Sequence, residues 1–146
     1  MFKRKGFTLV ELLIVMAVIA ILIAIAIPSF RGMQLEAKKS RAQGDVRVIK
    51  IAVESYYKNH SNAYPTFGTT WESSLTGASP QILEQSLSDP FSTIGEYKSA
   101  GSSNGQYYVI WSVGVNGASE ITGVSDAGVV QGTITDDVYE TNGQKQ

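Results

Sequence analysis

One carboxylate, Glu11, stands inside an almost unbroken apolar run from Phe7 to Ile27. As a helix, this run is about 31 Å long, close to the thickness of a bilayer's hydrocarbon core. A carboxylate at that depth costs about 2–3 kcal/mol, so it needs either a cationic partner or a side chain that reaches the interface. Charge pairing within a membrane is therefore the first chemistry that the sequence suggests, and a Glu11 that reaches water is the alternative.

No pattern in the sequence indicates catalysis. His60 is the only histidine, and neither a phosphate-binding glycine loop nor a dinucleotide-binding motif occurs. Cysteine is absent, which excludes disulfides and thiolate metal sites. The net charge of −1 does not favour nucleic acid as a partner. We therefore expect a structural or binding protein and not an enzyme.

The apolar run follows a short basic leader that ends at Gly6. Six residues are too few for the apolar segment that precedes cleavage of a conventional secretory signal, so we expect the run to remain in the mature protein. The residues KGFTLVELLIVMAVIAILIAIAIP resemble the amino terminus of the type IV pilin superfamily, which comprises pilins, type II secretion pseudopilins and competence pilins. Five positions carry the resemblance: Gly6, Phe7, Thr8, Glu11 and Pro28.

The resemblance implies that a prepilin peptidase cuts the Gly6–Phe7 bond and N-methylates the new first residue. Cleavage there leaves a cationic amine on Phe7, and methylation keeps its charge. When copies of the chain stack, we expect Glu11 to accept the Phe7 amine of a neighbour, because an axial misfit leaves both charges unpaired in hydrocarbon. This hypothesis assigns assembly to Phe7, Glu11 and Pro28, and it assigns catalysis to no residue.

Beyond Pro28 the sequence predicts that the helix continues over 29–58, because apolar residues recur at a spacing close to 3.6. We expect Pro28 to kink or loosen the helix, since it has no backbone N–H to donate. Polar residues such as Asp45 and Lys50 are expected to face solvent or other subunits. A stripe of apolar residues is expected to pack on a head: Val46, Ile49, Val53 and Tyr56.

The remainder of the chain predicts a small α+β head. We expect a loop after residue 59, a short helix over 79–87 capped by Ser79, and strands over 95–100, 106–114 and 128–135. The fold class is thus α+β, with a long amino-terminal helix packed on a small antiparallel sheet. Four segments are predicted: a leader (1–6), a transmembrane helix (7–28), an amphipathic continuation (29–58) and a globular head (59–146).

The head carries a second resemblance. The motifs YPT at 64–66 and DPF at 89–91, together with the segment 96–117, look like the major, G-type pseudopilin of type II secretion. Heads of this type often hold one calcium ion in the loop after the central strand, and oxygen ligands suit that ion. The resemblance implies three ligands here: Asn116, Glu120 and Asp126. A polar loop without a metal is the alternative, and calcium is the one cofactor that the resemblance implies.

The preferred interpretation is a pseudopilin that polymerises with copies of itself and helps a type II secretion system to export folded proteins. The resemblance further implies an inner-membrane assembly platform and other pilins or pseudopilins as partners, with a single membrane pass and a periplasmic head. Two alternatives stay open. One is a major or minor pilin of a cell-surface type IV pilus for adhesion or motility, and the other is a monomeric, membrane-tethered binding module.

Overall fold

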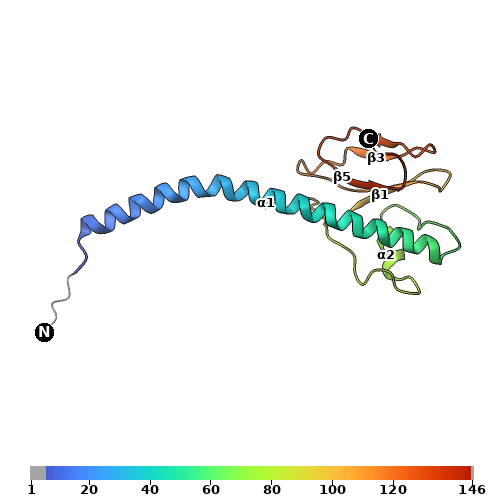
Figure 1. Cartoon of the computed structure of the whole chain (residues 1–146), viewed down its shortest axis with the longest axis horizontal. Helices are drawn as coiled ribbons and strands as arrows, with labels where there is room; N and C mark the ends of the chain where they lie inside the picture. Colours follow the sequence, from blue (N-terminus) through green and yellow to red (C-terminus); the bar gives the residue numbers. More distant parts are fainter. Residues whose placement is uncertain (1–5, 146) are drawn as a thin grey trace. The chain divides into compact units, whose positions relative to one another are not determined.

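The structure, a computed structural model, describes residues 6–145, so the predicted leader lies outside the described residues except for Gly6. The chain divides into two compact units, one up to Glu36 and one from Ala37 onward. Helix α1, Leu9–Asn59, contributes to both units (Figure 1). It stays helical through Pro28, which confirms that the helix continues beyond this proline.

The amino-terminal part of α1 is apolar around its whole circumference, and its side chains are exposed in the single chain. Among the described residues, α1 is the one helix that is long and apolar enough to cross a membrane. A helix that is apolar on every side requires apolar surroundings. Its sequence therefore suits a bilayer or the interior of an assembly.

The carboxy-terminal part of α1 buries one face in the second unit. Its 3.6-residue spacing aligns Val46, Ile49 and Val53, each no more than 1% exposed, and Tyr56 packs against the same cluster. This confirms the predicted apolar stripe. Two polar residues that were expected to face solvent contact the head instead. Asp45 accepts a hydrogen bond from the Tyr97 hydroxyl at 2.8 Å, and Lys50 donates to Glu140 at 3.3 Å.

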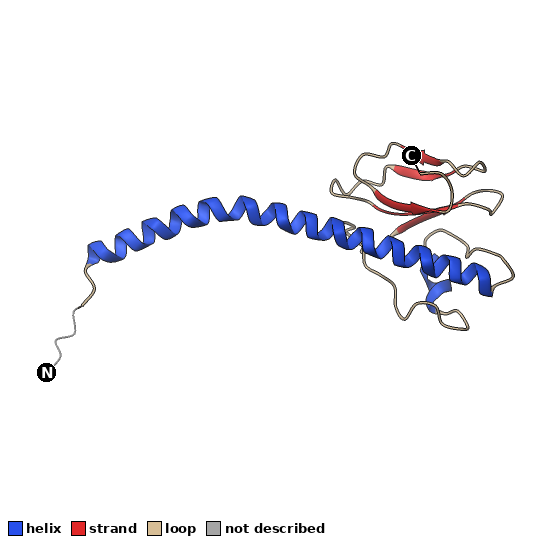
Figure 2. Ribbon diagram, in the orientation of Figure 1, coloured by secondary structure: helices blue, strands red, loops and turns tan. Residues whose placement is uncertain are grey.

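Within residues 6–145, five short strands form two antiparallel sheets (Figure 2). In the first sheet, β2 (Tyr108–Ser112) lies between β1 (Lys98–Gly101) and β5 (Val138–Thr141). In the second, β3 (Ile121–Val124) pairs with β4 (Val130–Gly132). The α+β fold class, with a long helix packed on a small antiparallel sheet, is confirmed.

Strand β2 is buried along its whole length because both faces of its sheet are covered. Tyr108 and Ile110 join the core beneath α1, whereas Val109 and Trp111 join a second core with β3 and β4. Side chains alternate between the faces of a strand, so this one strand supplies both cores. The second unit is therefore layered as helix, sheet and sheet.

The predicted helix over 79–87 is wrong. That segment contains no helix, and the Leu83 N–H donates to the Leu75 carbonyl at 3.3 Å. A short helix, α2 (Trp71–Thr76), occurs instead in the segment that was predicted to be a loop. Trp71 and Leu75 lie four residues apart, so one helical turn buries both. Tertiary burial outweighs the capping signal at Ser79.

The strand predictions are partly confirmed. The expected strands over 95–100, 106–114 and 128–135 overlap β1, β2 and β4, and the turn between the first two is closed by the Gly105 N–H, which donates to Ser102. Strands β3 and β5 were missed, and the single predicted sheet is two sheets. Strand β5, with the sequence VYET, has no clear apolar alternation, and only its pairing with β2 makes it a strand.

Candidate functional site

Thr8 and Glu11 form a reciprocal cap at the start of α1. The Thr8 N–H and its hydroxyl each donate to Glu11 Oε2 at 3.2 Å, and the Glu11 N–H donates to Thr8 Oγ1 at 3.2 Å. Thr8 directly precedes the first helical residue, so the arrangement is a capping box, in which two otherwise unsatisfied backbone donors gain partners. The sequence signal, T-x-x-E before an apolar run, was available but was not used in the prediction.

The cap occupies only part of the Glu11 carboxylate. Its Oε1 atom accepts no hydrogen bond from the described residues, and an ionised carboxylate can accept at both oxygens. Phe7, directly before the cap, is 80% exposed. Glu11 thus has an internal structural role at one oxygen and an unused acceptor at the other, on a helix end that is otherwise apolar.

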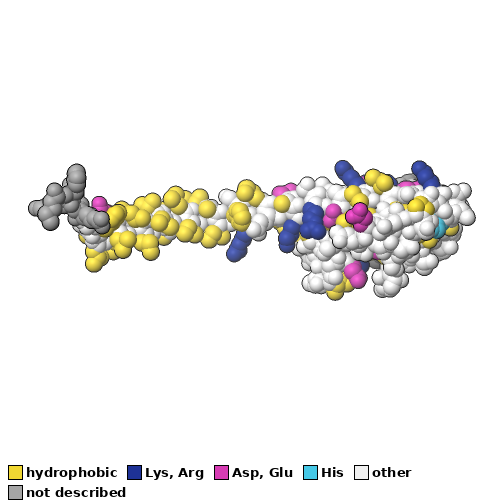
Figure 3. All heavy atoms as spheres, turned by 90° about the horizontal axis from the view of Figure 1, so that it is seen from below, with side chains coloured by type: hydrophobic (Ala, Val, Ile, Leu, Met, Phe, Trp, Pro, Cys, Tyr) yellow, Lys and Arg dark blue, Asp and Glu magenta, His cyan; other side chains and the backbone are white. Residues whose placement is uncertain are grey.

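Hydrophobic side chains cover the amino-terminal part of α1 in the view of Figure 3. The carboxy-terminal part also exposes apolar side chains on the face opposite its buried stripe, where Ile51 is 69% and Val48 is 48% exposed. Monomeric soluble proteins rarely leave large contiguous apolar patches exposed. These surfaces therefore indicate a membrane or neighbouring subunits.

The second unit contains an acidic cluster. Glu120, Asp136 and Asp137 each place one carboxylate oxygen within 4.8 Å of the others. Local hydrogen bonds hold the three side chains. Asp137 Oδ2 accepts the N–H groups of Glu120 and Ile121, both at 3.0 Å, and Glu120 Oε2 accepts the Thr135 N–H at 3.1 Å. Backbone N–H groups thus hold carboxylates of this cluster close to one another.

The cluster contains unused acceptors in a buried position. Asp137 is only 8% exposed, and both its Oδ1 atom and that of Asp136 are buried without a hydrogen-bond partner. Burial raises the pKa of Asp137, its backbone hydrogen bonds oppose the rise, and the nearby charges of Glu120 and Asp136 add to it. Converging carboxylates with free oxygens suit a hard divalent cation such as calcium.

The predicted calcium ligands are brought together only in part. The Asn116 side-chain amide donates to Glu120 Oε1 at 3.2 Å, and the Asn116 N–H donates to Asp136 Oδ2 at 2.8 Å. Asp126 lies beyond the other end of β3, where its carboxylate accepts the Asn104 N–H at 2.9 Å. Asp136 and Asp137 were not among the predicted ligands, because the loop that returns them to Glu120 is formed only by the tertiary fold.

The DPF motif at 89–91 has a structural explanation. Asp89 is 2% exposed and accepts three hydrogen bonds, from the Ser112 hydroxyl at 2.8 Å, the Phe91 N–H at 2.9 Å and the Val113 N–H at 3.2 Å. Its carboxylate thereby fixes the preceding loop to the end of β2. A buried carboxylate with three donors is well satisfied, so Asp89 is a fold determinant.

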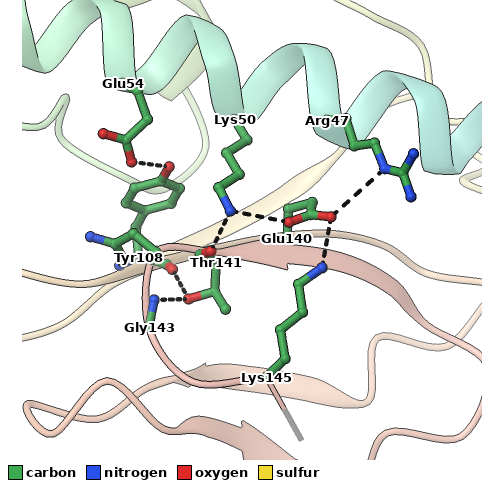
Figure 4. A network of polar contacts seen from close by, with 9 residues as sticks. Arg47, Lys50, Glu54, Tyr108, Glu140, Thr141, Gly143 and Lys145 are labelled. Atoms are coloured by element: carbon green, nitrogen blue, oxygen red, sulfur yellow. Dashed lines mark hydrogen bonds and ion pairs between the residues drawn. The ribbon is translucent and has the colours of Figure 1, made fainter.

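A polar network joins α1 to β5 (Figure 4). Glu140 accepts hydrogen bonds from Lys145 at 2.7 Å and Lys50 at 3.3 Å, and its carboxylate lies 4.0 Å from Arg47 Nε. Lys50 also donates to the Thr141 carbonyl at 2.8 Å. In a chain without cysteine, this network ties the carboxy-terminal strand to the helix.

We expect Glu140→Gln to lower the free energy of unfolding by about 1–2 kcal/mol at pH 7, because it removes charge-assisted hydrogen bonds. Burial alone would raise the pKa of Glu140, but the hydrogen bonds from Lys145 and Lys50 outweigh it and lower the pKa below 4.5. The stabilisation is therefore complete above pH 4.5 and is lost as the pH falls through the lowered pKa. Urea denaturation at pH 7 and pH 3 measures this loss.

Glu84→Gln is the matched control, because Glu84 is exposed and has no hydrogen bond or ion pair within the described part of the chain. Its free energy of unfolding is expected to match that of the unsubstituted protein. The difference between the unsubstituted protein and Glu140→Gln is expected to shrink at pH 3. An equal difference at both pH values would contradict the proposed role of the Glu140 charge.

Comparisons with known proteins add to this geometry. Residues 1–27 match the family model described as the prokaryotic N-terminal methylation motif. The chain is 38% identical over 88 residues to the type IV major fimbrial protein FimA of Dichelobacter nodosus, covering 59% of this chain and 55% of that protein. No solved structure gives a significant match.

Two further relatives match shorter segments of the chain. The type IV major pilin protein PilA of Myxococcus xanthus is 44% identical over 55 residues, which cover 38% of this chain and 25% of PilA. PilE1 of Neisseria gonorrhoeae, also a type IV major pilin protein, is 44% identical over 57 residues, covering 39% and 34% of the two chains. The matched segments thus span from a quarter to about half of the length of these three relatives.

Proposed function

We infer that this chain, which belongs to the type IV pilin superfamily, is a structural subunit that polymerises with copies of itself into a helical filament. The observation that carries the proposal is Glu11, a carboxylate with an unused acceptor oxygen at the end of an exposed apolar helix. After cleavage of the Gly6–Phe7 bond, the Phe7 amine of a neighbouring subunit supplies the cation that this oxygen lacks.

The apolar surface of α1 is consistent with two successive environments. Before assembly, the segment 7–28 spans the inner membrane once, with the head in the periplasm. During assembly, the same side chains leave the lipid and pack against the helices of neighbouring subunits, so the apolar area is never transferred to water. Exposed Val48 and Ile51 extend this packing surface along the second half of α1.

The finer assignment that we propose is a pseudopilin of a type II secretion system, which helps to export folded proteins. It rests on the head motifs around Tyr64 and Asp89 and on the acidic cluster, which suits one calcium ion held by Glu120, Asp136 and Asp137. When bound, calcium would neutralise these three carboxylates and would hold the loop around Glu120 against the loop that carries Asp136 and Asp137. The processing enzyme in this proposal is a prepilin peptidase, and the assembly partners are an inner-membrane platform and other pseudopilins.

The second candidate is a subunit of a surface type IV pilus for adhesion or motility. The observation that favours it is the description of the relatives, which are named major pilin and fimbrial proteins. Both candidates use the same processing and the same charge pair. They differ in the location of the filament and in the genes expected beside the gene for this chain, which would encode either a secretion system or a pilus motor.

Mass spectrometry of the native protein, after separation of sheared surface fibres from the cell envelope, tests the proposal. We expect a chain that begins at Phe7 and carries one N-terminal methyl group. A pseudopilin is expected in the envelope fraction, and a surface pilin is expected in the sheared fibres and lost from them on gene deletion. A mature protein that retains its leader would refute the filament proposal in both forms.

A further inference from the structure

Two adjoining depressions lie beside the carboxy-terminal end of α1, in the second unit. Their volumes are about 530 and 280 Å³, and Tyr64, Gly105 and Tyr107 line both. Together they fall within the size range of pockets that hold small molecules, which is about 300–1,000 Å³. The larger depression is also lined by Tyr57, Asn62 and Gln106.

The chemistry of this tyrosine–amide pocket, defined by the six residues above, is neutral. No charged side chain lines either depression, whereas two other depressions of the second unit are lined by both carboxylates and lysines. A charged ligand would be desolvated here without a counter-charge, and a purely apolar ligand would leave the amides unsatisfied. The pocket therefore suits a neutral molecule that is rich in hydrogen-bonding groups.

The side chains of the pocket divide into a fixed frame and a set with unused hydrogen-bonding capacity. In the frame, the Tyr64 ring stacks on Tyr57 with centroids 4.4 Å apart, and the Tyr64 hydroxyl accepts a hydrogen bond from Asn142 at 3.1 Å. A fixed frame lowers the entropy lost when a ligand binds.

The unused capacity belongs to two amides. Asn62 and Gln106 are exposed, and their side chains make no hydrogen bond to any described residue. Each amide offers two donors and an acceptor with two lone pairs, which matches the alternating donors and acceptors of sugar hydroxyls. Tyrosine adds a flat apolar ring that can cover the C–H face of a sugar and a hydroxyl that can bond to its edge.

We propose that the tyrosine–amide pocket binds a neutral oligosaccharide. The two depressions on either side of Tyr64 and Tyr107 accept neighbouring sugar rings, and Asn62 and Gln106 bind their hydroxyls. This function is additional to filament assembly, because the pocket uses no residue of the apolar, amino-terminal part of α1. It would give the filament or its free subunit a means of attachment to a glycan.

Binding is tested on the full chain in a zwitterionic detergent that has no sugar headgroup, by titration calorimetry. The probes are four neutral tetrasaccharides, namely chitotetraose, cellotetraose, maltotetraose and lacto-N-neotetraose, together with anionic 3′-sialyllactose. Chitotetraose and lacto-N-neotetraose represent N-acetylated glycans of bacterial and animal type. Cellotetraose and maltotetraose represent unmodified glucose polymers. We expect at least one neutral tetrasaccharide to bind.

Two variants locate the binding. Gln106→Ala and Asn62→Gly are each expected to weaken the affinity by roughly two- to tenfold, the effect of one hydrogen bond. Glycine is chosen at position 62 because Asn62 has φ 58°, a conformation that glycine adopts without strain. Gln85→Ala, which removes an exposed amide outside the pocket, is the matched control and is expected to leave the affinity unchanged.

The proposal is overturned if none of the neutral tetrasaccharides binds, if only 3′-sialyllactose binds, or if Gln106→Ala binds as tightly as the unsubstituted chain. Thermal melting of each variant shows that the head is folded. Glu11→Gln is expected to retain sugar binding in detergent. A failure of filament assembly and a failure of sugar binding are therefore separate results.

Discussion

Glu11→Gln is expected to abolish filament formation while membrane insertion and leader cleavage remain intact. Glutamine keeps the capping box with Thr8, because its side-chain oxygen can accept the same hydrogen bonds. It removes the negative charge, so the Phe7 amine of a neighbouring subunit would be buried without a partner. Leaving one member of a buried pair alone costs about 3–5 kcal/mol, which weakens each subunit contact by at least roughly a hundredfold.

Two controls separate pairing from capping. Thr8→Ala removes the cap, at a cost of about 1 kcal/mol, but leaves the Glu11 charge, so filaments are expected to form. Glu11→Asp keeps the charge on a shorter side chain and is expected to restore assembly in part. The readouts are electron microscopy of filaments and mass spectrometry of the processed amino terminus. Normal filaments from Glu11→Gln, with Thr8→Ala defective, would assign Glu11 to capping alone.

Calcium is expected to raise the melting temperature of the full chain in detergent by roughly 5–15 °C when its concentration is a hundred times the dissociation constant. Binding at that ratio adds about 2.7 kcal/mol to the free energy of unfolding, and a domain of this size melts several degrees higher for each such kcal/mol. The physical reason is the repulsion among Glu120, Asp136 and Asp137, which one divalent cation removes. Scanning calorimetry with calcium or with a chelator measures the shift.

The matched pair of variants is Asp137→Asn and Asp126→Asn. Asp137→Asn removes a buried ligand and is expected to abolish the calcium shift, whereas Asp126→Asn, outside the cluster, is expected to keep it. If Asp126→Asn abolished the shift and Asp137→Asn kept it, the ion would be bound by the ligands predicted from the sequence. No shift in millimolar calcium would remove the metal site altogether.

The pH dependence of the protein without calcium gives an independent test of the same cluster. Because the pKa of Asp137 is raised in the folded protein, its carboxyl group binds a proton more tightly there than in the unfolded chain. Its contribution to stability is complete below the ordinary pKa of 3.8 and is lost as the pH rises through the raised value. Saturating calcium is expected to cancel that loss, because the ion takes the place of the proton.

Much of the fold could be predicted from residues that are close in the sequence. The apolar run and the stripe from Val46 to Tyr56 are patterns within α1, the alternation is a pattern within β2, and both elements are present. The turn between β1 and β2 was likewise readable from its Ser, Asn and Gly residues. The family resemblance also lies in one continuous segment, where spacing alone places Glu11 one turn from Phe7.

Elements and contacts that depend on residues far apart in the sequence could not be predicted from local patterns. Strand β5 exists because its backbone pairs with β2, and Lys50 meets Glu140 across 90 residues. Helix α2 formed where burial of Trp71 and Leu75 outweighed the polar composition of its segment.

By itself, the sequence determined the amino-terminal membrane segment with its single carboxylate, the long helix and the absence of cysteine chemistry, because these are properties of local composition and period. Only the tertiary structure decided which carboxylates gather with Glu120 and which tyrosines and amides share a pocket. The physical reason is that loop closure and strand register bring such residues together, and neither is encoded in the spacing of any one segment.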